Sequence, residues 1–128
     1  MEPGLASALI LLALLQVKHL FADFFLQTHR MLMGRDEYVH LGRIQHVGIH
    51  GGLSFVVLAF AGVPVVLAGL LCVLEAAVHY HIDWIKGWYT AVKEHGPTDA
   101  NYWRAFGTDQ LAHQLTYIAM IWVLIASA

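Results

Sequence analysis

Four segments of the chain each carry two side chains suited to metal binding, placed four residues apart. Residues with this spacing lie on the same face of an α-helix, so each pair projects from one side of its segment. Neutral imidazole and carboxylate groups are ligands for Zn²⁺, Fe²⁺ and Mn²⁺. The spacing therefore predicts a site for one or two divalent ions, with zinc favoured and iron or manganese as alternatives. The eight predicted ligands are His19, Asp23, His46, His50, His79, Asp83, Asp109 and His113.

The predicted ligands outnumber the four that one tetrahedral ion takes, so either two ions bind or several of these groups orient the others. Side chains for catalysis are also predicted. Glu75, one helical turn before His79, and Asp23 are predicted to accept a proton, with Asp109 as an alternative. Lys86 lies on nearly the same face as Glu75 and is predicted to hold an anionic group. Equally, Lys86 could have no binding role and simply extend its charged end to the membrane interface.

The composition excludes several classes of protein. Of the 128 residues, 59% are hydrophobic and 12% are charged, whereas a soluble domain carries about 25% charged residues. Intrinsic disorder needs low hydrophobicity and high net charge, and this chain has neither. A formal net charge of −2 gives no general attraction to nucleic acid, and Cys72, the single cysteine, excludes an internal disulfide and a thiolate zinc cluster. What remains is a small integral membrane protein.

Four apolar stretches are long enough, or nearly so, to cross a membrane as helices, since about 20 apolar residues span the hydrocarbon. They cover residues 5–28, 43–62, 64–88 and 104–126. The first stretch also has the length of a signal peptide, but no Lys or Arg precedes it and Lys18-His19 makes a poor cleavage site. The sequence thus predicts an all-α fold, with residues 1–128 forming a single domain, an integral membrane four-helix bundle.

Basic residues gather in or beside the first and third connections between these stretches. Six of the seven Lys and Arg residues lie there: Arg30, Arg35, Arg43, Lys86, Lys93 and Arg104. Because positively charged connections face the cytoplasm, both termini are predicted to be non-cytoplasmic. With this topology, the four ligand pairs fall in one layer near the cytoplasmic ends of their helices. Four-helix bundles build metal sites from such inward-facing layers.

The ordered motifs resemble those of a family of small bacterial membrane proteins catalogued as a domain of unknown function. The motifs are His19-Leu-Phe-Ala-Asp-Phe-Phe-Leu-Gln27, His46-x-x-x-His50, His79-x-x-x-Asp83-x-x-Lys86 and Asp109-Gln110-x-x-His113. The resemblance covers nearly the whole chain and implies a multi-pass, four-helix protein of the bacterial inner (cytoplasmic) membrane with these residues as its functional set. It implies no activity. A looser similarity of plan links the chain to predicted membrane-bound metal-dependent hydrolases, which is an analogy only.

A metal-dependent hydrolase is the leading functional hypothesis. Its site, a few helical turns inside the cytoplasmic leaflet, suits a lipidic or amphipathic substrate. The alternatives are a proton or cation pathway, a haem- or pigment-binding subunit, and a non-catalytic accessory subunit. The expected partners are membrane lipid and an amphipathic small molecule, not nucleic acid, with a homo-oligomer or a larger membrane complex as further options.

Overall fold

The computed structural model describes residues 4–127, and within that range the chain forms helices and no strand. In chain order they are α1 (Leu5–Leu20), the π-helical turn η1 (Phe21–Phe25), α2 (His29–Leu32), α3 (Leu41–Phe60), α4 (Val65–Val92) and α5 (Ala100–Ala126). The predicted all-α class is therefore confirmed.

The predicted start at residue 5 and the predicted end at residue 126 agree with α1 and α5, whereas the other helix ends differ from the ends of the apolar stretches. The first stretch is predicted to reach residue 28, whereas the helical backbone ends at Phe25. Helices α3 and α5 begin before the predicted starts at 43 and 104, and α4 continues beyond 88. Hydropathy marks where a chain can be surrounded by hydrocarbon, whereas a helix continues as long as its backbone hydrogen bonds are made. Polar residues therefore extend α4 and α5 past their apolar parts.

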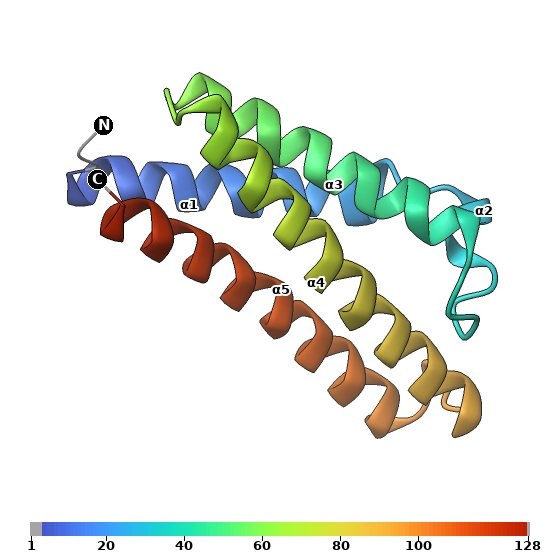
Figure 1. The fold of residues 1–128 in the computed structure, drawn as a ribbon. Helices are drawn as coiled ribbons and strands as arrows, with labels where there is room; N and C mark the ends of the chain where they lie inside the picture. The colour runs from blue at the N-terminus through green and yellow to red at the C-terminus, as the bar shows by residue number, and fades with distance from the viewer. Residues whose placement is uncertain (1–3, 128) are drawn as a thin grey trace.

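The four long helices pack around one interior. Helix α1 contacts α3 and α5, and α4 contacts the same two helices. The start of α1, the α3–α4 turn and the end of α5 lie at one end of the molecule, while α2 and the loop before α5 lie at the other (Figure 1). Gly62, whose φ of +76° favours glycine, forms the α3–α4 turn. The first and third connections therefore share an end, which we call the loop end.

The interior is apolar in one half and polar in the other. Leu15, Leu58 and Ala68 are fully buried in the apolar core, which occupies the half away from the loop end. Among residues 4–127, ten polar or charged residues are also buried: Lys18, His19, Arg43, His46, His50, Ser54, Glu75, His79, Asp109 and His113. Large apolar side chains meanwhile lie on the outside, including Phe60, which is 90% exposed. Buried polar groups together with large exposed apolar side chains are unusual in a water-soluble protein.

Two helical segments are long and apolar enough to cross a membrane: Leu5–Phe25, which joins α1 to η1, and α4. Helices α3 and α5 are long but less apolar, because their halves nearest the loop end carry the polar pairs. Four membrane crossings and non-cytoplasmic termini thus remain predictions.

Candidate metal centre

A π-helical turn sets the position of Asp23. The backbone N–H of Leu26 donates to the carbonyl of Phe21 at 2.9 Å, an i→i+5 bond that widens the last turn of the first helix. Such turns are rare and occur frequently at functional sites. The widened turn carries Asp23 at the point where the chain leaves the helix, beside the polar layer.

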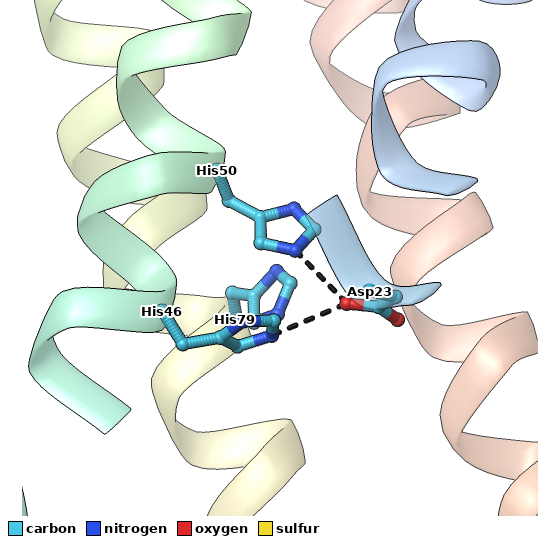
Figure 2. A group of neighbouring side chains, drawn as sticks. All are labelled: Asp23, His46, His50 and His79. Atoms are coloured by element: carbon cyan, nitrogen blue, oxygen red, sulfur yellow. Dashed lines mark hydrogen bonds and ion pairs between the residues drawn. The ribbon is translucent and has the colours of Figure 1, made fainter. Parts of the chain in front are cut away.

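The Asp23 carboxylate meets imidazoles from two helices. Its Oδ1 lies 2.9 Å from Nε2 of His50 and 3.2 Å from Nε2 of His46, both on α3 (Figure 2). Its Oδ2 lies 3.1 Å from Nε2 of His19 and accepts a 3.3 Å hydrogen bond from Nε2 of Gln110. Asp23 thereby links α1, α3 and α5.

The Asp83 carboxylate has a matching place on α4. Its Oδ1 lies 3.1 Å from Nε2 of His113, and its Oδ2 lies 3.2 Å from Nε2 of His79 and 3.5 Å from Nε2 of His46. All five predicted histidines therefore direct Nε2 at one of two carboxylates. Each of these histidines is at most 4% exposed, and the centre of the His79 ring lies 4.0 Å from the ring centres of both His50 and His113.

Two groups of side chains have ligand atoms close enough together to hold a metal ion. One consists of Asp23, His46, His50 and His79, and the other of His79, Asp83 and His113. In each group the ligand atoms lie within 4.8 Å of one another. Because His79 belongs to both groups, the two potential sites are adjacent.

The hydrogen bonding of these imidazoles fits a metal ion. Within the described chain, neither ring nitrogen of His79 has a hydrogen-bond partner, and neither does Nδ1 of His46. The Nε2 atom of His79 is near Asp83, but the two groups are not aligned for a hydrogen bond. An unsatisfied buried polar group costs about 1–3 kcal/mol, and a ligated metal would remove part of that cost. Buried nitrogen and carboxylate donors are also the set that zinc takes.

The other predicted site residues lie around these groups. Two predicted ligands, His19 and Asp109, belong to neither group. The Oδ1 of Asp109 is 3.6 Å from Nε2 of His113, and its Oδ2 is 3.5 Å from Nζ of Lys86. Glu75 lies deeper, where its Oε1 is 2.5 Å from Nζ of Lys18. Asp109 and Lys86 thus border the layer on the side of the loop end, and Glu75 borders it on the apolar side.

Three side chains outside the predicted ligand set hold the layer in place, and of these sequence reasoning missed Tyr117 entirely. The hydroxyl of Tyr117 lies 2.9 Å from Nδ1 of His19, and Nζ of Lys18 lies 3.4 Å from Nδ1 of His50. Gln110 places its Oε1 3.2 Å from Nε2 of His19. A hydrogen bond donated by Nδ1 of His19 to Tyr117 leaves a lone pair on Nε2, the arrangement usual for a metal-bound histidine. Lys18 can only donate, so Nδ1 of His50 is the acceptor in that contact. Tyr117 follows Asp109 and His113 at the same spacing of four, which is a signal that would have identified it.

Arg43 is used differently from the other basic residues of the loop end. It is buried, and its guanidinium donates to the carbonyls of Glu37 at 2.6 Å and Tyr38 at 3.0 Å, and also to the carbonyl of Arg35. These bonds hold the loop before α3 against the helices. A Cβ atom on Gly87 of α4 would overlap the Arg35 carbonyl, so this loop also depends on glycine there.

A small polar cavity lies beside the two groups that could bind a metal, which we call the metal-binding groups. Its volume is about 90 Å³, and its lining includes Asp23, His46, Asp83 and Asp109. The cavity gives water or a small polar group access to the imidazole layer. The same cavity is also lined by Arg35, Arg43, Lys86, Tyr102 and Phe106.

The fold and this cluster define a helical protein with a buried histidine and aspartate layer that could hold a metal ion. The chain belongs to the family described as "Protein of unknown function (DUF3307)", which matches residues 10–128. The predicted relationship to an uncharacterised family is thus confirmed. No curated protein and no solved structure matches the chain.

Proposed function

We propose that this protein is an integral membrane four-helix bundle that binds one or two divalent ions, zinc favoured, and hydrolyses an amphipathic substrate near the cytoplasmic leaflet. The observation that carries the proposal is the convergence of five buried histidines on Asp23 and Asp83 beside an accessible polar cavity. The apolar exterior of all four long helices supports burial in lipid. The basic residues at the loop end support a cytoplasmic position for that end.

The two groups could supply different numbers of protein ligands to a metal ion. Asp23, His46, His50 and His79 supply four donors, which completes a tetrahedral site. If His79 serves that site, Asp83 and His113 remain for the second, with room for water or substrate. Catalytic zinc sites keep such an open position, whereas structural ones are closed. Asp83 borders the polar cavity, so an open position there would be accessible.

A bound divalent ion would activate water and polarise an ester oxygen. Hydrolysis adds the water oxygen to the phosphorus or carbonyl centre and breaks its bond to the departing alcohol. One water proton goes to a carboxylate, and the departing oxygen takes up a proton. Asp109 suits the role of acceptor because it lines the cavity and its Oδ1 has no hydrogen-bond partner among the described residues. Lys86 beside it suits an anionic group of the substrate. Glu75, paired with Lys18, does not line this cavity.

A proton pathway is the second candidate, because the Lys18–Glu75 pair extends the polar layer toward the apolar half. Beyond this pair, however, lies the apolar core, where Leu15 and Leu58 are fully buried. A polar layer that ends against such a core favours a site over a pathway. A proton pathway would have to continue outside the described chain, for example in an oligomer.

Elemental analysis of the purified protein tests metal binding. We expect one or two equivalents of zinc, iron or manganese per chain, reduced in His79→Ala and His113→Ala. The matched control is His29→Ala, since His29 is exposed and outside both groups. Folded, metal-free wild-type protein would contradict the proposal, and a Soret band would indicate haem instead. Hydrolysis is tested separately with phosphoester amphiphiles, where Asp109→Asn should retain metal and lose turnover. Turnover that survives full metal removal would contradict the hydrolase.

A further inference from the structure

A second, larger cavity lies between α4 and α5. Its volume is about 470 Å³, within the roughly 300–1,000 Å³ that small-molecule sites occupy. Ile82, Ile85 and Tyr89 line it from α4, and Ala105 and Ala112 line it from α5. We call it the α4–α5 groove. Its lining is mostly apolar, which suits a hydrocarbon chain.

The α4–α5 groove and the polar cavity meet at two charged residues. Lys86 and Asp109 line both spaces. Nζ of Lys86 lies 3.5 Å from Oδ2 of Asp109 and 4.7 Å above the centre of the Phe106 ring. A molecule in the groove would therefore bring one end to Lys86, beside the metal-binding groups.

The charges around this junction favour an anion. The polar cavity has three carboxylates, Asp23, Asp83 and Asp109, and three basic side chains, Arg35, Arg43 and Lys86. These charges balance, so one divalent ion gives the cavity a net positive charge. Because Arg43 is bonded to backbone carbonyls, Lys86 is the basic group at the junction itself. A phosphate monoester carries about −1.5 to −2 charges near neutral pH, which matches one divalent ion.

The sizes of the two cavities indicate which part of a ligand each could hold. The polar cavity, at about 90 Å³, has room only for a small head group. Only the α4–α5 groove has room for a longer apolar part. Exposed apolar residues flank it, with Ile85 54% exposed on α4 and Leu111 52% exposed on α5. In a bilayer, a hydrocarbon chain would reach the groove sideways without crossing water.

We infer that the α4–α5 groove binds the hydrocarbon chain of a phosphate-bearing amphiphile and places its phosphate at Lys86, beside the metal-binding groups. This inference rests on the proposed function, because it names the substrate class for the same site. The ligand enters from the membrane, and its head group reaches the polar cavity along Lys86 and Asp109.

Photo-crosslinking with a dodecyl phosphate analogue that carries a diazirine in its chain tests this inference. The protein is placed, with its metal, in nanodiscs of zwitterionic lipid, and labelled peptides are mapped by mass spectrometry. We expect labels concentrated on the groove residues of α4 and α5. Unlabelled dodecyl phosphate should compete, whereas dodecanol and inorganic phosphate at the same concentration should compete at least about tenfold less well, because each lacks one half of the ligand.

Matched variants test the two parts of the site. Ala112→Phe fills the groove and should abolish labelling, while Leu111→Phe on the neighbouring lipid-facing position should not. Lys86→Gln should weaken competition by dodecyl phosphate roughly tenfold, since it removes a charged donor, while Lys93→Gln at the exposed end of α4 should not. Helix content and metal content are measured for each variant, so that misfolded protein is not scored.

Labels spread evenly over the lipid-facing surface would overturn the inference, as would equal competition by dodecanol. Competition by inorganic phosphate as strong as by dodecyl phosphate would show that the groove holds no chain. If protein with its full metal content gives any of these contrary results, only the inference about the groove is overturned, and the proposed metal site is unaffected. Metal-free protein that still labels at the groove would instead refute the proposed function and retain the lipid site.

Discussion

The buried pair of Lys18 and Glu75 offers a direct test of how the interior is held together. The side chains are 5% and 1% exposed, and Nζ lies 2.5 Å from Oε1. At this separation, with an effective dielectric constant of about 20, their attraction is about 7 kcal/mol. Desolvation of both charges offsets most of it, so the intact pair adds little net stability. Removing only one partner leaves the other charge buried without compensation.

We therefore expect Glu75→Leu to lower the free energy of unfolding by about 3–5 kcal/mol. That corresponds to a change of roughly a hundred- to several thousand-fold in the folding equilibrium. Lys18→Met should also destabilise the protein. The double variant should be close to the wild type in stability, because no unpaired charge remains. The assay is reversible unfolding of detergent-solubilised protein, with the coupling energy taken from the double-mutant cycle.

Additive effects of the two single substitutions would refute this reasoning, as would a cost below about 1 kcal/mol for Glu75→Leu. The double variant also separates two roles for Glu75. If Glu75 serves to hold Lys18, the double variant keeps its metal and its turnover. If Glu75 accepts a proton in the reaction, the double variant is stable and binds metal but is inactive.

Three further outcomes are expected. Gly87→Ala should displace the loop whose Arg35 carbonyl contacts Gly87, and should reduce access to the polar cavity. The measurement is the rate at which the bound metal exchanges with a chelator, which should become slower. The control, Gly69→Ala, lies on the same helix with open space around it and should leave this rate unchanged. Tyr117→Phe removes the hydroxyl beside Nδ1 of His19, whose Nε2 contacts the Asp23 carboxylate of the first group, and should weaken metal binding by about 10-fold in a chelator competition assay. Metal removal should lower the free energy of unfolding by about 2.7 kcal/mol, compared with protein in a metal concentration 100 times the dissociation constant. The melting temperature should fall accordingly. An unchanged melting temperature after verified metal loss would contradict a site that is formed only in the folded state.

The sequence alone was sufficient to predict the helical class and the faces of the polar pairs. The reason is local: a spacing of four places two side chains on one helix face whatever surrounds the helix. As this spacing predicts, Nε2 of His19 lies 3.1 Å from Oδ2 of Asp23, and Nε2 of His79 lies 3.2 Å from Oδ2 of Asp83. Helix ends were less predictable, because hydropathy does not report where backbone hydrogen bonding stops.

Only the tertiary structure decided which pairs meet and what each residue does. His46 contacts both Asp23 and Asp83, although the three residues lie on different helical segments, because packing of α1, η1, α3 and α4 sets their separation. The same packing separates Asp109 from the metal-binding groups and pairs it with Lys86. The π-turn at Asp23 and the groove between α4 and α5 likewise have no local signal, because they depend on how neighbouring helices fit. The sequence determined the residue types of the candidate ligands and their helix faces, and the packing of the helices determined which of them come together.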